Sequence, residues 1–347
     1  MKLPMLRLLG LFSAAWLLAG VAVAQTPAAA PSAPQPQAEN RSINDWLLRM
    51  HEASRRRTYV GTFVVSSAVG MSSARIWHVC DGTQQIERVE ALTGRPRFTF
   101  RHNDQVTTFH PDAGVVRSDK RESLGLFPGL LLSSNAAIPD FYMVRQLHAD
   151  PTERVAGHDA DVLLLKPKDN LRFGYRVWSE KKSGLVVKLQ TLDVDGTVLE
   201  QAAFSELQLD APVRMDKLAQ QMARTEGYRV EKSNLSKTTA SAEGWALKSP
   251  VAGFKSISCY RRPVASAASA SAQAAQNAMQ WVFSDGLASV SLFVEPFDAQ
   301  RHAREAALSI GATQTLTRRV NDWWLTAVGE VPAQTLQAFA QSLERKK

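Results

Sequence analysis

The spacing of apolar residues predicts a helix near residue 42. Four apolar residues recur there at positions that share one helix face: Ile43, Trp46, Leu47 and Met50. Ser42 precedes them and Asp45 follows three residues later, an arrangement typical of a capping box. We therefore expect a helix with one buried face.

Between residues 58 and 112 the apolar spacing changes to every second residue, which predicts short strands. Pairs such as Asp81-Gly82 separate the runs and are typical of turns. The pattern favours an antiparallel meander. An apolar stretch over residues 122–135 interrupts it and predicts one or two short helices packed against the sheet, and strands resume over residues 142–209.

A two-residue turn at Asp195-Gly196 would place Asp193 opposite Val198 in a hairpin. Apolar residues then lie on both faces of the hairpin, whereas a sheet with one solvated face alternates more cleanly. We expect the sheet of the first domain to be covered on more than one side.

The N-terminus has the three zones of a cleavable secretory signal. Lys2 and Arg7 supply positive charge, an apolar stretch follows over residues 8–21, and Ala22 and Ala24 offer small side chains to a signal peptidase. A transmembrane anchor is the alternative, but the apolar stretch is short for a ~30 Å hydrocarbon core. The sequence favours export.

Composition and periodicity divide the chain into five parts. We expect a signal peptide over residues 1–24, a disordered Ala/Pro-rich tether over 25–40, a large domain over 41–210, a linker over 211–242 and a small α+β domain over 243–347. Within the small domain we expect strands over 255–260, 279–284 and 287–294, a helix over 299–309, a hairpin around Asn321-Asp322, and a last helix with Pro332 in its first turn.

Two assumed turns, Asp285-Gly286 and Asn321-Asp322, assign side chains of the small domain to faces. Phe293 then lies on a mostly polar face, and Trp324 lies opposite Arg319 on the face away from the core. An outward Trp is a common interface anchor, so these three residues are candidates for binding a partner. Stacking of Trp324 on Arg319 within the chain is the alternative, and a one-residue slip would exchange the faces.

Charge and cysteine content narrow the class of protein. The formal net charge of +8 includes no dense basic block, and nucleic acid is scarce outside the cytoplasm, so no nucleic-acid partner is expected. The only two cysteines, Cys80 and Cys259, exclude a disulfide-dense scaffold, and whether they are bridged stays open.

Catalytic signatures are missing from the sequence. Ser179 and Lys182 match S-x-x-K, but they fall at a charged turn between strands, whereas that chemistry needs a helix N-terminus. The histidines are scattered without the spacing of metal ligands. We expect no catalytic residue, no metal and no cofactor, and therefore a binding protein and not an enzyme.

Large apolar side chains are spread through the β-rich domain and its apolar insert. A packed core is the simpler interpretation, and a ligand cavity lined by these side chains is the alternative. The candidate cavity residues are Phe63, Trp77, Phe100, Phe127, Leu130, Leu131, Phe141 and Phe173. If the ligand of this cavity is a lipid, Arg95, Arg97 or Arg101 would at most select its head group.

An ordered set of short motifs resembles the MucB/RseB family. The motifs of the large domain are Phe173-Gly174-Tyr175-Arg176-Val177-Trp178, Gly184-Leu185-Val186-Val187-Lys188, Asp195-Gly196 and Leu199-Glu200-Gln201. Those of the small domain are residues 250–254, Arg261-Arg262-Pro263, Phe283-Ser284-Asp285-Gly286-Leu287 and Val328-Gly329-Glu330-Val331-Pro332. The resemblance runs in order from about residue 42 to residue 344.

This resemblance implies a periplasmic negative regulator of the sigma-E/AlgU envelope-stress pathway. Such a regulator binds the periplasmic domain of a MucA/RseA-like anti-sigma factor, shields it from proteolysis, and senses acylated lipid such as lipopolysaccharide or lipoprotein. The implied fold is mainly β with α: a large LolA-like unclosed antiparallel β-barrel over helices, plus a smaller α+β C-terminal domain. The resemblance also implies that the small domain is the main site that binds the anti-sigma factor.

Two other functions stay open at this point. One is a periplasmic carrier or chaperone for acylated cargo, although a simple carrier needs only the cavity and not the second domain. The other is an envelope hydrolase whose catalytic residues come together only in the fold. The oligomeric state is not determined by the sequence, and a homo-oligomer stays open.

The first prediction concerns export. Because Ala22 and Ala24 satisfy the small-residue rule for cleavage, the mature chain should begin at Gln25. Intact-mass measurement on periplasmic material checks this, and a mass that retains residues 1–24 would contradict it.

Overall fold

The computed structural model describes residues 41–103, 105–120, 138–147, 153–232, 235–263, 277–302 and 304–346. The expected signal peptide, the tether and the apolar insert over residues 122–135 lie outside these ranges. Within them, no helix is both long and apolar enough to cross a membrane.

Helix α1 (Ile43–Arg56) begins as the sequence predicts. The Asp45 backbone N–H donates to the Ser42 hydroxyl at 3.2 Å, and the Ser42 backbone N–H donates to the Asp45 carboxylate at 3.1 Å. Hydrogen bonds from Ser42 to the carboxylate hold the pKa of Asp45 below its usual value. Trp46, Leu47 and Met50 are buried, so the predicted capping box and buried face are both confirmed.

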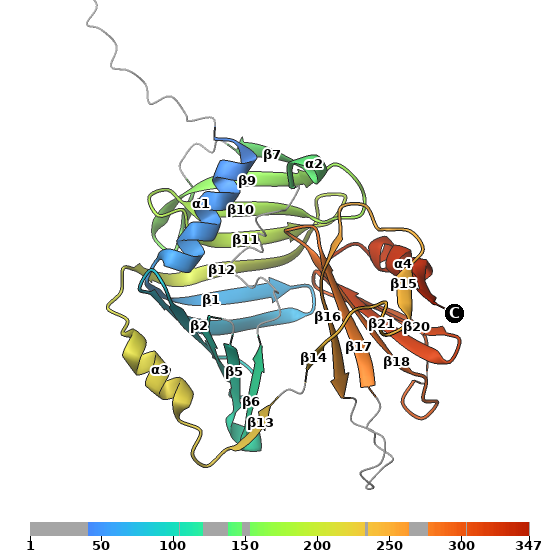
Figure 1. Ribbon diagram of the computed structural model, residues 1–347. Helices are drawn as coiled ribbons and strands as arrows, with labels where there is room; N and C mark the ends of the chain where they lie inside the picture. The colour runs from blue at the N-terminus through green and yellow to red at the C-terminus, as the bar shows by residue number, and fades with distance from the viewer. Residues whose placement is uncertain are drawn as a thin grey trace, which may run out of the picture. The chain divides into compact units, whose positions relative to one another are not determined.

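The large domain is built on a 13-stranded sheet (Figure 1). Its strands are β1 (Tyr59–Ser67), β2 (Gly70–Cys80), β3 (Gln85–Ala91), β4 (Phe98–His102), β5 (Gln105–His110), β6 (Val115–Lys120), β7 (Tyr142–Leu147), β8 (Arg154–Val155), β9 (His158–Pro167), β10 (Gly174–Glu180), β11 (Val186–Leu192), β12 (Val198–Leu209) and β13 (Arg229–Lys232).

The order of strands is β13-β6-β5-β4-β3-β2-β1-β12-β11-β10-β9-β7, with β8 paired to β9. Among the strands that the structure describes, the end strands β13 and β7 are not paired with each other, so the sheet is unclosed. Neighbours are antiparallel except β13 and β6, which are parallel. The antiparallel meander expected from the residue pattern is confirmed, as is the mainly β, unclosed architecture that the family resemblance implies.

Within the described ranges, helices pack on this sheet at two places. Figure 1 shows α1 lying across β9 to β12, and its buried residues pack with Leu163, Tyr175 and Val186 of those strands. Helix α3 (Met215–Ala223) packs Leu218 and Met222 against a second cluster that includes Phe100 and Phe109. A short helix α2 (Ile138–Phe141) leads into β7, and a 3-10 turn η1 (Pro111–Ala113) joins β5 to β6.

The β11–β12 hairpin has the predicted register where its strands pair. Thr191 lies opposite Glu200 and Lys188 opposite Ala203, as a turn at Asp195-Gly196 requires. The ladder shifts by one residue at Leu192, which faces Val198. Local turn chemistry therefore determined most of this pairing.

The small domain contains a seven-stranded antiparallel sheet in the order β14-β16-β17-β18-β21-β20-β19. Its strands are β14 (Ser236–Lys237), β16 (Lys255–Pro263), β17 (Asn277–Ser284), β18 (Ser289–Pro296), β19 (Ala306–Ile310), β20 (Thr313–Val320) and β21 (Trp323–Gly329), and β15 (Trp245–Leu247) pairs separately with β22 (Leu343–Arg345). Helix α4 (Ala333–Ser342) follows Pro332, and its Leu336 and Phe339 are buried in the core of this domain.

One predicted element of the small domain is wrong. Residues 299–309 do not form a helix: residues 298–302 turn back on themselves, and β19 pairs with β20. The Asp298 carboxylate accepts from the Gln300 backbone N–H at 2.9 Å, which favours a turn over a helix. The ladder with β20 then outweighs the local helix preference of the alanines.

The segment expected as a linker, residues 211–242, contributes elements to both sheets. It contains α3 and β13, which belong to the large domain, and β14, which pairs with β16 of the small domain. Both cysteines are free thiols, Cys80 in β2 and Cys259 in β16. Burial raises the pKa of Cys259 to about 11.

Arg172, in the connection from β9 to β10, joins the two sheets. Its side chain is completely buried, as is that of Asp285 in the β17–β18 turn, and Nε donates to the Asp285 carboxylate at 2.6 Å. Nη2 donates to the Ala252 carbonyl at 2.6 Å and Nη1 to the Asp169 carboxylate at 2.5 Å. Every nitrogen of this buried guanidinium therefore has an acceptor, as a buried charge requires.

The second prediction concerns this ion pair. Arg172→Met should lower the free energy of unfolding by about 3–5 kcal/mol, because it leaves the buried Asp285 carboxylate without its cation. Urea denaturation of the mature chain measures the loss. Adding Asp285→Asn to Arg172→Met should recover part of the loss, since the unpaired charge is then gone.

The matched control is Arg56→Met, which breaks an exposed pair with Glu52 at 3.7 Å. It should cost less than about 1 kcal/mol. Equal losses for Arg172→Met and Arg56→Met would contradict a dominant role for the buried pair.

Candidate ligand pocket and partner-binding surface

The structure does not bring the described candidate cavity residues together. Phe63 packs edge-to-face on Phe204 with ring centroids 6.2 Å apart, in the cluster that also holds Trp178. Trp77 and Phe100 belong to the cluster under α3. Phe127, Leu130 and Leu131 lie outside the described residues.

The two remaining candidates lie at the other end of the sheet. Phe141 packs beside the cluster under α1, and Phe173 is 2% exposed at the start of β10. Five strands separate β4, which carries Phe100, from β10. The sequence shows which side chains are large and apolar, but the order of strands determines which of them meet.

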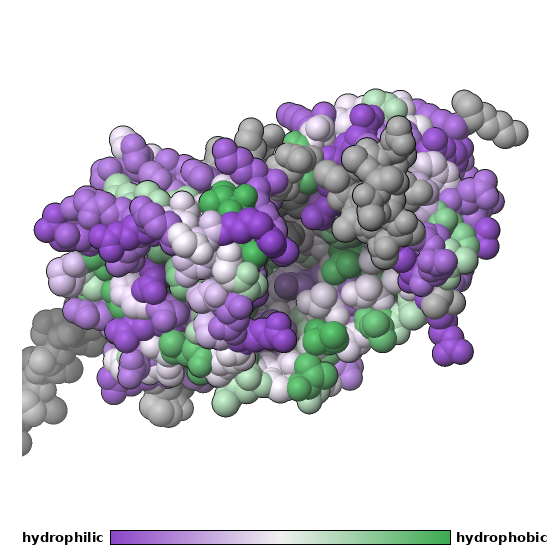
Figure 2. Space-filling model, turned by 90° about the horizontal axis from the view of Figure 1, so that it is seen from below, coloured by the Kyte–Doolittle hydropathy of each residue, from purple (hydrophilic) through white to green (hydrophobic). Residues whose placement is uncertain are grey.

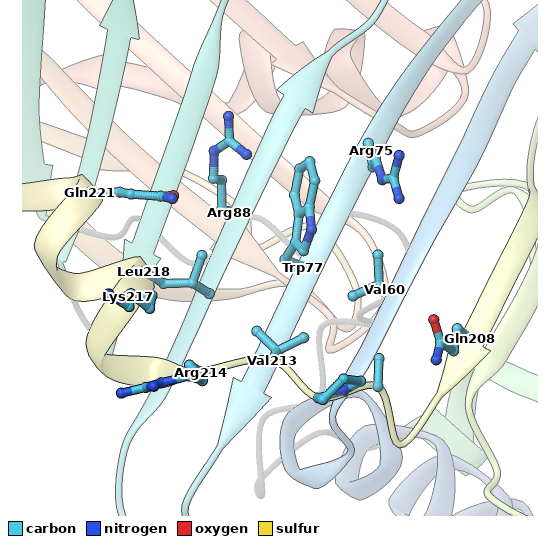
Figure 3. Close-up of a pocket in the computed structure, with 12 residues that line it drawn as sticks. Val60, Arg75, Trp77, Arg88, Gln208, Val213, Arg214, Lys217, Leu218 and Gln221 are labelled. Carbon is cyan, nitrogen blue, oxygen red and sulfur yellow. The ribbon is translucent and has the colours of Figure 1, made fainter.

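A pocket of about 470 Å³ lies between α3 and strands β1 to β3 (Figure 3). The sheet side is formed by Val60, Arg75, Trp77 and Arg88, and the other side by residues 211–214 and by α3. Leu218 points from α3 toward the sheet, and its packing holds the helix there. Of the five candidate cavity residues that the structure describes, Trp77 is the one that lines this pocket.

Two arginines flank Trp77 within the pocket. The guanidinium carbon of Arg88 lies 4.6 Å from the centre of the Trp77 ring, and that of Arg75 lies 5.3 Å from it. Arg88 also donates to the Glu90 carboxylate at 2.7 Å. Cation–π contacts of this kind hold guanidinium groups beside an aromatic face while leaving N–H donors for other acceptors.

The helix side of the pocket is also basic. Arg214 donates to the Asp216 carboxylate at 3.0 and 2.6 Å, which raises the pKa of Arg214 and lowers that of Asp216. Lys217 lines the pocket one residue further on. Among the described residues, the lining therefore holds four basic side chains and no acidic one, so it suits a ligand with an anionic group beside an apolar part.

The residues expected to select head groups do not reach this pocket. Arg101 is paired with the Glu87 carboxylate, and Arg95 and Arg97 are exposed at the β3–β4 connection. The sequence did contain a signal for Arg75, since it stands two positions from Trp77 and so shares its face of β2. Arg88 lies opposite Trp77 in the β2–β3 ladder and was not among the residues predicted from the sequence.

The hairpin registers of the small domain are predicted in part. Val320 lies opposite Trp323 and Arg319 opposite Trp324, as a two-residue turn at Asn321-Asp322 requires. At the other hairpin Phe283 lies opposite Val290 and not Ala288, a shift of two residues. An even shift keeps each side chain on its face, so the assignment of faces survives.

Trp324 is not an exposed anchor, and this expectation is corrected. Its side chain is 6% exposed and stacks on His302, with ring centroids 4.9 Å apart and an angle of 7° between the rings. Phe297 packs beside it at 6.0 Å. The connection from β18 to β19 folds over this face and covers the ring.

The other two candidates for partner binding are also in contact within the chain. The Arg319 guanidinium lies 4.0 Å from the centre of the Phe297 ring and not on Trp324. Phe293 is partly buried, with Arg262 at 5.7 Å from its ring. A role for Phe293, Trp324 and Arg319 in partner binding stays a prediction. Among the side chains that the structure describes, no group of three metal-ligating residues is found.

Comparisons with known proteins identify the family. A sequence profile of the MucB/RseB N-terminal domain matches residues 42–222, and a profile of the MucB/RseB C-terminal domain matches residues 239–344. This chain belongs to the MucB/RseB family.

Relatives in this family are sigma-factor regulatory proteins. The chain is 27% identical over 320 residues to the Sigma factor AlgU regulatory protein MucB of Pseudomonas aeruginosa, covering 89% of this chain and 92% of that protein. It is 23% identical over 308 residues to the Sigma-E factor regulatory protein RseB of Haemophilus influenzae, covering 88% and 92% respectively.

Solved structures of MucB have the same fold. The crystal structure of MucB in complex with MucA(peri) matches with a TM-score of 0.64 at 24% identity, over 88% of this chain and all of that chain. A crystal structure of MucB matches with a TM-score of 0.62 at 23% identity, over 87% and 98%. Both sheets of this MucB/RseB protein therefore belong to a known architecture.

The third prediction tests whether the Trp324 side chain is buried and the Phe293 side chain only partly buried. Trp324→Ala should lower the free energy of unfolding by about 3–5 kcal/mol, because it removes a buried ring stacked on His302. Phe293→Ala should cost only about 1 kcal/mol, since that ring is partly exposed. Thermal and urea unfolding of both variants check the difference, and a Trp324→Ala protein as stable as the wild type would contradict the burial.

Proposed function

We propose that this protein is a periplasmic negative regulator of a sigma-E/AlgU-type stress response. It binds the periplasmic region of a membrane-bound MucA/RseA-like anti-sigma factor and shields that region from regulated proteolysis. The supporting observation is that both MucB/RseB domain profiles match in order, over residues 42–222 and 239–344. The fold is that of MucB, which has been crystallised with MucA(peri).

Release of the anti-sigma factor is proposed to follow the binding of acylated lipid or lipoprotein to the large domain. The pocket under α3 supports this part, because it places Trp77 among Arg75, Arg88, Arg214 and Lys217. An anionic head group would lie against the guanidinium groups while adjoining acyl carbons contact Trp77 and Leu218. Apolar burial at ~0.8 kcal/mol per methylene outweighs an exposed ion pair, so the acyl part dominates affinity.

A periplasmic carrier of acylated cargo is the second candidate, favoured by the same pocket. A carrier needs only the large domain, whereas residues 239–344 of this chain match the second domain of the family. The regulator therefore accounts for more of the chain.

The fourth prediction tests binding and release together. The mature chain should bind the purified periplasmic region of the anti-sigma factor and slow its cleavage by the site-one protease. Acylated lipopolysaccharide should dissociate the complex, and the deacylated form should not. Calorimetry and a timed cleavage assay measure the two effects.

A double variant, Trp77→Leu with Arg88→Met, should bind the anti-sigma factor normally but need about tenfold more lipid for release, because a cation–π pair of ~1–2 kcal/mol is lost. Arg56→Met serves as the matched surface control. If the chain binds the anti-sigma region but lipid has no effect on the complex, the proposed regulator is supported and lipid-induced release is contradicted. Lipid binding without anti-sigma binding would favour the carrier.

A further inference from the structure

The small sheet ends in a strand whose outer side has no partner among the described strands. Strand β19 is last in the sheet order and pairs only with β20. The two strands are joined by the two-residue turn Gly311-Ala312, in which Gly311 has a φ of +58°. A glycine at the first position is typical of such hairpin turns.

This hairpin geometry determines which backbone groups of β19 are free. The residues that flank a two-residue turn exchange both ladder hydrogen bonds, and the pattern repeats every second residue. Ile310, Leu308 and Ala306 therefore bond toward β20. The N–H and C=O groups of Ala307 and Ser309 point away from the sheet, toward the open edge.

The side chains of β19 do not protect this edge. Natural edge strands usually carry charged residues or proline, which discourage pairing with other chains. Residues 306–310 contain neither. Leu308 and Ile310 are 61% and 62% exposed, and being two positions apart they lie on the same face.

A second pair of exposed apolar residues belongs to the β1–β2 hairpin, which the turn approaches at Ser67. A Cβ on Gly311 would lie 3.1 Å from Cβ of Ser67, so the β19–β20 turn abuts the end of the β1–β2 hairpin. Val69 and Met71 of that hairpin are 66% and 73% exposed. Figure 2 shows one face of the molecule, on which hydrophobic residues reach the surface in separate groups among hydrophilic ones.

The dimensions of the edge indicate what kind of partner it fits. A strand of five residues spans about 17 Å. Pairing two such strands buries much less than the ~1,200 Å² of a stable protein interface, so β19 is too short to hold two copies of the chain together by itself. It suits one segment of a larger interface: an extended stretch that adds a strand to the sheet and places alternate apolar side chains on Leu308 and Ile310.

We propose that β19 is a docking edge for an extended, apolar segment of the anti-sigma factor's periplasmic region. This inference rests on the function proposed above and assigns part of that binding to one strand. The partner segment hydrogen-bonds to the N–H and C=O groups of Ala307 and Ser309. Its apolar side chains contact Leu308 and Ile310, and neighbouring residues extend toward Met71.

The experiment compares Ser309→Pro with Ser309→Ala in the full mature chain. Proline removes the outward N–H and leaves the bonds to β20 in place, whereas alanine keeps that N–H. Both variants lose the hydrogen bond that the Gln314 side chain donates to the Ser309 hydroxyl at 2.7 Å, so alanine controls for it. Titration calorimetry with the purified periplasmic region should show at least tenfold weaker binding for Ser309→Pro and unchanged binding for Ser309→Ala.

Side-chain contacts are tested by Leu308→Asn with Ile310→Asn, which should also weaken binding at least tenfold. The matched control is Leu92→Asn, because Leu92 is 50% exposed after β3, in a different sheet. In the wild-type chain, hydrogen exchange at Ala307 and Ser309 should slow when the anti-sigma region is added. That measurement needs no variant and decides the proposal even if Ser309→Pro fails to fold.

Full affinity of Ser309→Pro and of the double Asn variant, without slowed exchange in the complex, would overturn the docking edge and leave the proposed function standing. A wild-type chain that does not bind the anti-sigma region would overturn both. If the amides are protected only as chain concentration rises, without the partner, the edge serves self-association and the proposal is wrong.

Discussion

The buried guanidinium of Arg172 joins the two sheets through hydrogen bonds to both. Its neighbours come from separate parts of the chain: Asp285 and the Ala252 carbonyl from the small domain, and Phe141 from the large one. Phe254 also lies near it, 4.9 Å from the guanidinium carbon to the ring centre. A buried charge is tolerated only when its donors are satisfied, so these segments are tightly constrained in position.

Two local features follow from that constraint. Gly253, at a φ of +81°, lies so close to Arg172 that any Cβ there would overlap its guanidinium and the Phe141 ring. The other oxygen of Asp285 accepts from the backbone N–H groups of Leu287 at 2.9 Å and Ala288 at 2.8 Å. The carboxylate that binds Arg172 thus also closes the β17–β18 turn, which explains why the turn is two residues longer than a minimal hairpin.

The two proposed binding surfaces would bind their ligands through different interactions. The pocket under α3 combines an aromatic ring with guanidinium groups, which suits a ligand that is part anionic and part apolar. The edge at β19 offers backbone groups and two aliphatic side chains, which suits an extended peptide. The chain passes from β13 of the large sheet to β14 of the small one, and β14 lies at the opposite end of the small sheet from β19. A regulator of the proposed kind needs both a ligand site and a partner site.

The sequence by itself determined the structural features that depend only on neighbours within a few residues. The capping box of α1, the register at Asn321-Asp322, and the alternation that puts Phe283 and Leu292 on one face all follow from turn chemistry and period. Motifs spread over the chain also indicated the family, which both domain profiles confirm. Only the tertiary structure decided that Trp324 is covered by Phe297 and His302, that residues 306–310 form a strand, and that Phe63, Phe100 and Phe173 lie in separate parts of the large sheet. Burial and strand order arise from contacts between residues distant in sequence. Local hydrophobic periodicity does not indicate which distant residues will be in contact.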